Sequence, residues 1–126
     1  MTGINKIPVV RVRDNLLVSI QEDMIDEMAV HLQTDILDQL VATYTNGVLI
    51  DISALDMIDS FLARKFSEIA KLAAIMDAAV VVVGMQPAVA LTLVELGLDL
   101  KEVHYALNMD CGMEFLDAMK HNSPEV

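Results

Sequence analysis

The segment of the sequence with the most chemical potential runs from Asp51 to Ser60 and consists of the residues DISALDMIDS. It follows a short apolar run and precedes a helical pattern of apolar residues, so it is expected to join a strand to a helix. In open α/β sheets, functional residues usually lie at this end of the strands. We therefore take this segment as the candidate functional site.

Ser60 stands at or near the start of the predicted helix, which allows two interpretations. Serine often caps a helix, because its Oγ accepts a hydrogen bond from a free backbone N–H. Alternatively, Ser60 is phosphorylated, and the phosphate faces the positive helix end with Arg64 one turn further on. A phosphoserine carries roughly −1.5 to −2 charges at neutral pH. Because Asp51, Asp56 and Asp59 crowd the same segment, the phosphate would change its electrostatics sharply, as a switch requires.

Other kinds of site find little support in the sequence. His31 and Asp35 form an ordinary helical surface pair, and His104 and His121 have no Cys or acidic cluster at metal-ligand spacing. Ser60 has no obvious histidine base, so no nucleophile–base pair can be assembled. We therefore predict no metal, no cofactor and no enzymatic activity.

Composition restricts the class of protein and its partners. The 126 residues suffice for one domain, and 55% hydrophobic residues predict a packed core. With 19 acidic and 8 basic residues the net charge is −11, which repels phosphate backbones and excludes nucleic acid as an expected partner. The single Cys111 and the lack of a long apolar run predict a cytoplasmic protein that does not enter a membrane.

The order of expected elements predicts an α/β fold. Pro8–Arg13 and Leu16–Ile20 form an antiparallel hairpin with a turn at Asp14–Asn15, and a helix follows over about 23–44. The remaining elements are strand Val48–Ile50, a helix from Ser60, the doubly buried strand Val80–Val83, helix Pro87–Leu96, strand Val103–Ala106, and a helix from Asn108 to about Lys120. We expect one domain over residues 4–120, with a mixed sheet and about four helices, and a tail over 121–126.

Helix Pro87–Leu96 is apolar nearly all round, since Thr92 and Glu95 are its polar members. A helix of this kind is usually buried on all sides, which is difficult within so small a domain. We therefore predict an oligomer interface on this helix, formed by Val89, Leu91, Leu93 and Val94.

Two stretches resemble a known family. GVLIDISALDMIDSF and VVVVGMQPAVALTLVELG are similar to the STAS domain (anti-sigma-factor antagonist) family, and the likeness runs from about Ile7 to Met119. The Asp-Ser pair at the helix start is typical of these antagonists. The Asp-Ser-Phe version and the Gly-x-Gln-Pro turn resemble, more narrowly, the single-domain scaffold proteins of the bacterial stressosome.

The resemblance implies a function and a set of partners. It places the family's phosphorylated serine on Ser60, with Asp59 before it, in a non-catalytic scaffold. It implies an RsbT-like serine kinase that is held until phosphorylation releases it, an RsbX-type phosphatase, and homo- or hetero-oligomers with RsbR-type STAS proteins. The residues expected to flank the phosphosite and meet the kinase are Asp51, Asp56, Ile58, Asp59, Phe61 and Arg64.

Two alternatives compete with this interpretation. A receiver-like domain would be phosphorylated on Asp51, but it needs an acidic pair after its first strand, where Asp14 precedes Asn15 and a hairpin. It also needs a hydroxyl residue after the next strand, where Gly84 stands. A small-molecule-binding flavodoxin-like domain needs a polar pocket at the strand ends, and the sequence offers acids there without a glycine-rich cradle.

Overall fold

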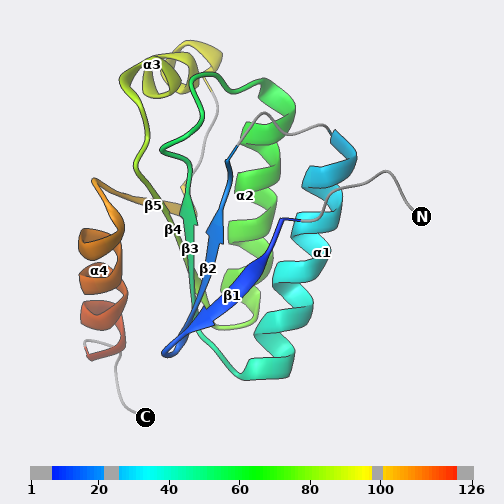
Figure 1. Ribbon diagram of the computed structural model, residues 1–126, viewed down its shortest axis with the longest axis vertical. Coiled ribbons are helices and arrows are strands. Elements are labelled where there is room, and N and C mark those ends of the chain that lie inside the picture. Colours follow the sequence, from blue (N-terminus) through cyan, green and yellow to red (C-terminus); the bar gives the residue numbers. More distant parts are fainter. Residues whose placement is uncertain (1–6, 22–25, 98–100, 122–126) are drawn as a thin grey trace.

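The computed structural model describes residues 7–21, 26–97 and 101–121, and these fold as alternating strands and helices (Figure 1). In chain order the elements are β1 (Val9–Val12), β2 (Asn15–Ser19), α1 (Asp26–Thr43), β3 (Gly47–Asp51), α2 (Ser60–Ile75), β4 (Ala79–Val83), α3 (Pro87–Leu96), β5 (Val103–Ala106) and α4 (Met109–His121). The expected α/β class and the expected succession of elements are confirmed.

The five strands form one mixed sheet in the order β1-β2-β3-β4-β5. Strands β1 and β2 are antiparallel, and all other neighbours are parallel. The hairpin turn differs from the prediction by one residue: it lies at Arg13–Asp14, with Arg13 at φ 56°, because Val12 pairs directly with Asn15. Asn15 belongs to the strand because its side chain is buried and hydrogen-bonded to Lys120.

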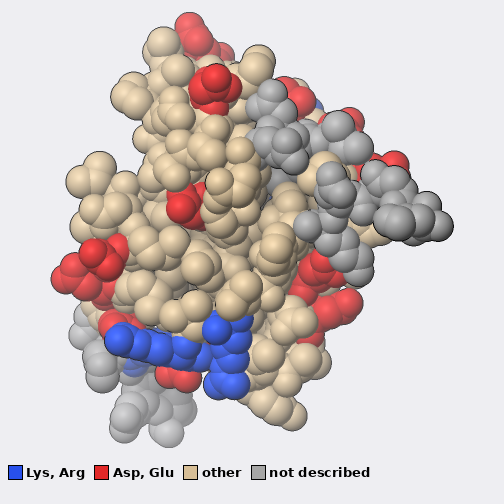
Figure 2. All heavy atoms as spheres, in the orientation of Figure 1, with Lys and Arg blue, Asp and Glu red and all other residues tan. Residues whose placement is uncertain are grey.

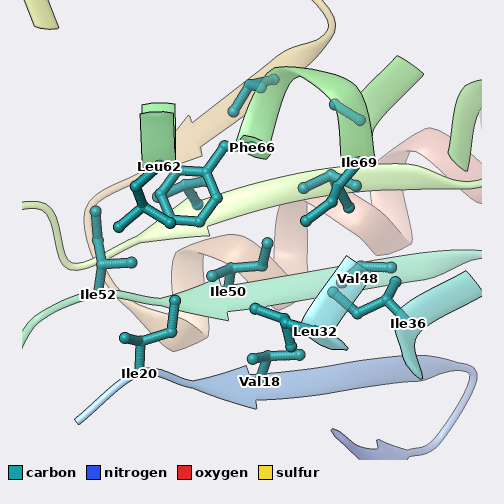
Figure 3. Packing of buried hydrophobic residues seen from close by; sticks show 14 of the residues in the cluster. Val18, Ile20, Leu32, Ile36, Val48, Ile50, Ile52, Leu62, Phe66 and Ile69 are labelled. Carbon is teal, nitrogen blue, oxygen red and sulfur yellow. The ribbon is translucent and has the colours of Figure 1, made fainter. Parts of the chain in front are cut away.

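The two faces of the sheet are covered differently. Helices α1 and α2 cover one face, α4 covers the other, and α3 lies across the end of the sheet where the parallel strands finish (Figure 1). Figure 3 shows the larger core, in which strand side chains meet those of α1 and α2. The labelled members are Val18, Ile20, Leu32, Ile36, Val48, Ile50, Ile52, Leu62, Phe66 and Ile69.

Strand β4 is buried on both faces, as its uninterrupted run of valines predicts. Val80 and Val82 belong to the core under α1 and α2, whereas Val81 and Val83 pack with Leu116 of α4. Successive side chains of a strand point to opposite faces, so both faces of this central strand are apolar.

The ends of the helices agree with their sequence signals. Helix α3 ends at Gly97 in the left-handed conformation, and Asn108 Oδ1 accepts a hydrogen bond of 2.9 Å from the Cys111 amide at the start of α4. The proposed first residues of the domain (4–6), the first part of the expected 23–44 helix (23–25), and residues 122–126 of the proposed tail lie outside the described residues. Within the described chain, no helix combines the length and apolarity needed to cross a bilayer.

Candidate functional site

Three buried apolar side chains anchor the loop between β3 and α2 to the core. Ile52, Leu55 and Ile58 are buried, with 0%, 1% and 7% of their surfaces exposed. Backbone hydrogen bonds of 3.0 Å from Ile52 N to Val83 O and from Leu55 N to Ile52 O fix its first half. Between these anchors, Asp56 and Met57 face solvent. Ile58, predicted to contact a kinase, therefore holds the loop in place rather than presenting itself to a partner.

Asp59, and not Ser60, caps α2. The Asp59 carboxylate accepts a hydrogen bond of 2.8 Å from the Leu62 amide, and its backbone has the extended conformation typical of a cap. Ser60 is the first residue of the helix and is half-buried. Its Oγ has no hydrogen bond to any described residue. The structural interpretation of Ser60 as a cap is therefore wrong, because the preceding carboxylate already occupies that position.

The remaining predicted site residues lie in different environments. Phe61 is half-buried, with Lys65 Nζ 5.7 Å from its ring centroid, whereas Arg64 is exposed. Asp51 is half-buried at the end of β3, and its Oδ1 accepts a hydrogen bond of 2.9 Å from the Ser53 amide. Within the described part of the chain, Arg64 and Asp51 form no ion pair. Within the described residues, the site thus combines the unbonded Ser60 hydroxyl with carboxylates and the exposed Arg64 guanidinium.

The turn between β4 and α3 is hydrogen-bonded to this loop. This contact was not predicted from the sequence. Gln86 Nε2 donates a hydrogen bond of 2.9 Å to the Ser53 carbonyl. Gly84 has φ 75°, and a Cβ added there would lie 2.9 Å from Ser53 Cβ and 3.1 Å from Asp51 Oδ1. The signal was present in the Gly-x-Gln-Pro turn: glycine permits the close approach and glutamine supplies the donor.

The four residues of α3 that were predicted to form an oligomer interface differ in burial. Val89 is fully buried and Leu93 packs partly against the core. Leu91 and Val94 are 60% and 77% exposed. Val89 therefore belongs to the chain's own core, and an interface on α3 would rely mainly on Leu91 and Val94.

Neither metal chemistry nor a receiver-like arrangement is supported by this geometry. No group of three His, Cys, Asp or Glu side chains in the described segments could hold a metal ion. The strand positions beside Asp51 are Ser19 and Val83, so neither of these paired positions supplies a carboxylate among the described residues. Asp51 is therefore better explained by its bond to the Ser53 amide than as a phosphate acceptor.

Comparisons with known proteins agree with this architecture. The family model for the STAS domain matches residues 6–110. A variant of RsbS from Moorella thermoacetica is 35% identical, with 91% of this chain and 97% of that chain covered and a TM-score of 0.80. A structure described as the molecular architecture of the stressosome, a signal integration and transduction hub, is 36% identical over 90% of this chain and 98% of its own, with a TM-score of 0.77.

A protein of Thermotoga maritima shares the fold at 20% identity, with 88% of this chain and 94% of its own covered and a TM-score of 0.74. No curated protein gave a significant match. The STAS match spans most of the sequence, and the chain belongs to the STAS domain family.

Proposed function

We propose that this protein is a non-catalytic, RsbS-like scaffold and anti-sigma-factor antagonist that holds an RsbT-like serine kinase and releases it when Ser60 is phosphorylated. The proposal is supported by similarity to RsbS and to a stressosome structure over about nine tenths of the chain. The observation that carries it is the position of Ser60. Its hydroxyl lies in the first turn of α2, and the helix is capped by the neighbouring Asp59 carboxylate instead.

The local chemistry favours a switch that changes the surface and preserves the fold. Because Asp59 holds the cap, a phosphate on Ser60 removes no hydrogen bond that the helix requires. The positive end of the helix dipole and Arg64 offset part of the added charge. Asp56 and Asp59, however, lie in the same loop, so a dianion is added to an already acidic surface. A partner that fits the hydroxyl must then desolvate a phosphate, which weakens the contact.

The wider role follows from the same likeness. The scaffold would assemble in the cytoplasm with RsbR-type STAS proteins, and an RsbX-type phosphatase would restore the hydroxyl. Leu91 and Val94 of α3 are candidates for a contact between subunits, because they are exposed apolar residues on one short helix. The kinase would meet the Ser60 surface, with Asp56, Asp59, Phe61 and Arg64 around it.

Mass spectrometry tests the modification directly. The protein is incubated with its cognate RsbT-like kinase and ATP, and intact and peptide masses are measured. We expect one acid-stable phosphate on Ser60, absent from Ser60→Ala and retained in Ser53→Ala, a matched control with an exposed serine in the same loop. Absence of phosphate, or a hydroxylamine-labile phosphate on Asp51, would contradict the proposal and favour the receiver-like alternative.

A further inference from the structure

A cavity of about 500 Å³ lies at the end of the sheet where the parallel strands begin. It is bordered by the end of α2, by the first residues of β4 and β5, and by the last turns of α4. A volume of this size falls within the range of small-molecule sites. The described walls of the cavity include neither Ser60 nor α3, so it is separate from the proposed phosphosite and from the proposed subunit contact.

Small side chains and a short strand leave this space open. The lining includes residues whose side chains end at Cβ, namely Ala70, Ala74, Ala78 and Ala79. Strand β5 begins at Val103, opposite Val80, so Ala79 has no paired residue in β5 among the described residues. Leu116 and Met119 of α4 complete the apolar part of the lining. The cavity therefore has an apolar floor that suits an aliphatic chain.

The end of the cavity near β3 carries an ammonium and an amide. Asn46 directly precedes β3, and Lys120 Nζ donates a hydrogen bond of 3.2 Å to Asn15 Oδ1 at the start of the neighbouring β2. Asn15 uses one of the three N–H donors of this ammonium, and Asp14 Oδ2 lies 3.9 Å away. Figure 2 shows basic side chains gathered at the lower end of the view, where the β1–β2 turn and the end of α4 lie in Figure 1. This end of the cavity therefore suits an anionic group.

The walls below β4 and β5 carry carboxylates. Asp77 stands between α2 and β4 with φ 63°, and Glu102 directly precedes β5. Both are exposed, and neither forms an ion pair with another described residue. Lys101 precedes Glu102 in the chain but does not line the cavity. Strands β3 and β5 are two strand spacings apart, or about 10 Å, so the ammonium and the Glu102 carboxylate lie toward different ends of the cavity.

We propose that this cavity binds a small aliphatic zwitterion whose ammonium and carboxylate lie at opposite ends of the molecule. The ligand's ammonium would meet Asp77 and Glu102, its carboxylate would meet Lys120 and Asn46, and its methylene groups would cover the alanines. A linear amino acid such as ε-aminocaproate fits this description, because its extended chain separates the two charges by about 7 Å. The site lies at the opposite end of α2 from Ser60, and the inference does not rest on the proposed function.

An NMR titration tests the two charges of the ligand separately. Amide spectra are recorded with ε-aminocaproate, with hexylamine and with hexanoate at constant ionic strength. We expect ε-aminocaproate to saturate with a dissociation constant on the order of 1 mM and to shift the amides of Ala74, Ala79 and His104 but not that of Ser60. Each singly charged analogue should bind at least about fivefold more weakly. Absence of saturation by about 10 mM, or equal affinity for either analogue, would overturn the proposal.

Two variants and a control test the walls of the cavity. The double variant Asp77→Asn, Glu102→Gln removes both carboxylates, and asparagine tolerates the left-handed φ at position 77. Ala74→Leu fills the cavity from an exposed position of α2, where leucine favours the helix.

The two variants and the control should respond differently. We expect the double variant and Ala74→Leu each to weaken ε-aminocaproate binding at least about fivefold, whereas Glu95→Gln, which neutralises an exposed carboxylate on α3, should bind normally. Circular dichroism confirms that all three fold. Unchanged affinity in either cavity variant, or an equal loss in Glu95→Gln, would overturn the proposal. No kinase is present in these titrations, so failure of the phosphorylation switch would not affect their outcome.

Discussion

The two ends of the parallel strands have opposite characters. At the end where the strands finish, the β3–α2 loop presents Asp56, Met57 and Asp59 to solvent, and the Ser60 hydroxyl bonds to none of the described residues. At the end where they begin, polar groups are buried and bonded to one another. The comparison separates the part of the molecule where we propose a modification from a part that holds the fold.

Asn15 organises the end where the strands begin. It is only 1% exposed, and its Oδ1 accepts a hydrogen bond of 3.2 Å from Lys120 Nζ while its Nδ2 donates to Met113 Sδ at 3.5 Å. Gly47 lies against it, since an added Cβ would clash with Asn15 Oδ1. These contacts tie the end of α4 to β2, and they leave little room for change.

The difference indicates why the proposed charged modification would be tolerated at one end. A buried polar group that loses its partner costs about 1–3 kcal/mol, so charge added near Asn15 would destabilise the fold. Ser60 is half-buried in the first turn of a helix that another residue caps. The proposed phosphate there would change the surface without opening the core.

The largest expected effect is on kinase release. Ser60→Ala should abolish ATP-dependent release of the bound kinase, while its free energy of unfolding should change by less than about 0.5 kcal/mol, because Ser60 is not the cap. Ser60→Asp should weaken kinase binding only partly, because it carries less charge than a phosphate. Co-purification of the kinase in the presence of ATP measures its release. Urea unfolding measures the stability of each variant. Loss of kinase binding by Ser60→Ala would contradict the model of sequestration.

Gly47→Ala should destabilise the end of the sheet where the parallel strands begin. The added methyl meets Asn15 Oδ1 and lies 2.9 Å from Leu116 Cδ1, so we expect a loss of about 1–3 kcal/mol in the free energy of unfolding. Phosphate incorporation into the folded protein should be unchanged. In an Asn15→Ala background the same substitution should cost less, because the clashing oxygen is gone. Equal costs in the two backgrounds would show that Asn15 does not set the close approach.

Gly84→Ala should disturb the loop that carries Ser60. The left-handed φ of 75° alone costs about 1–2 kcal/mol for a residue with a Cβ, and contact with Ser53 adds to it. Gly97→Ala is the matched control, since Gly97 has φ 63° and no described atom within 4 Å of the added Cβ. Urea unfolding should show the larger loss for Gly84→Ala, and only that variant should lower kinase affinity.

The smallest effect concerns the cap of α2. Asp59→Ala should lower the free energy of unfolding by about 1 kcal/mol, because the Leu62 amide loses its acceptor. Asp59→Asn should retain most of this stability, since asparagine caps a helix about as well as aspartate. Thermal unfolding distinguishes the two variants. If both lost the same stability, charge rather than the capping hydrogen bond would be responsible.

Local patterns predicted most of the fold. The strand at 80–83 was predicted from an unbroken run of β-branched residues, and the helix after Ser60 from its repeat of apolar residues; the structure follows both closely. The hairpin turn was misplaced by one residue, because Asn15 resembles a turn residue and its buried bond to Lys120 joins positions 105 apart in sequence. Such long-range contacts leave no local signal.

The position of the candidate segment between a strand and a helix was predicted, but its internal geometry could not be derived. Asp59 and Ser60 are both good capping residues, so the sequence does not decide between them. The bond from Gln86 to the Ser53 carbonyl joins two loops, and the burial of Val89 depends on how α3 sits on the end of the sheet. These features require the folded arrangement of distant segments.

The affinity of the cognate kinase for the protein before and after phosphorylation tests the central claim most directly. Titration calorimetry with fully phosphorylated and unphosphorylated protein gives both dissociation constants. We predict that the phosphate on Ser60 weakens binding by about tenfold or more, which corresponds to at least about 1.4 kcal/mol. Equal or tighter binding of the phosphorylated protein would contradict the account.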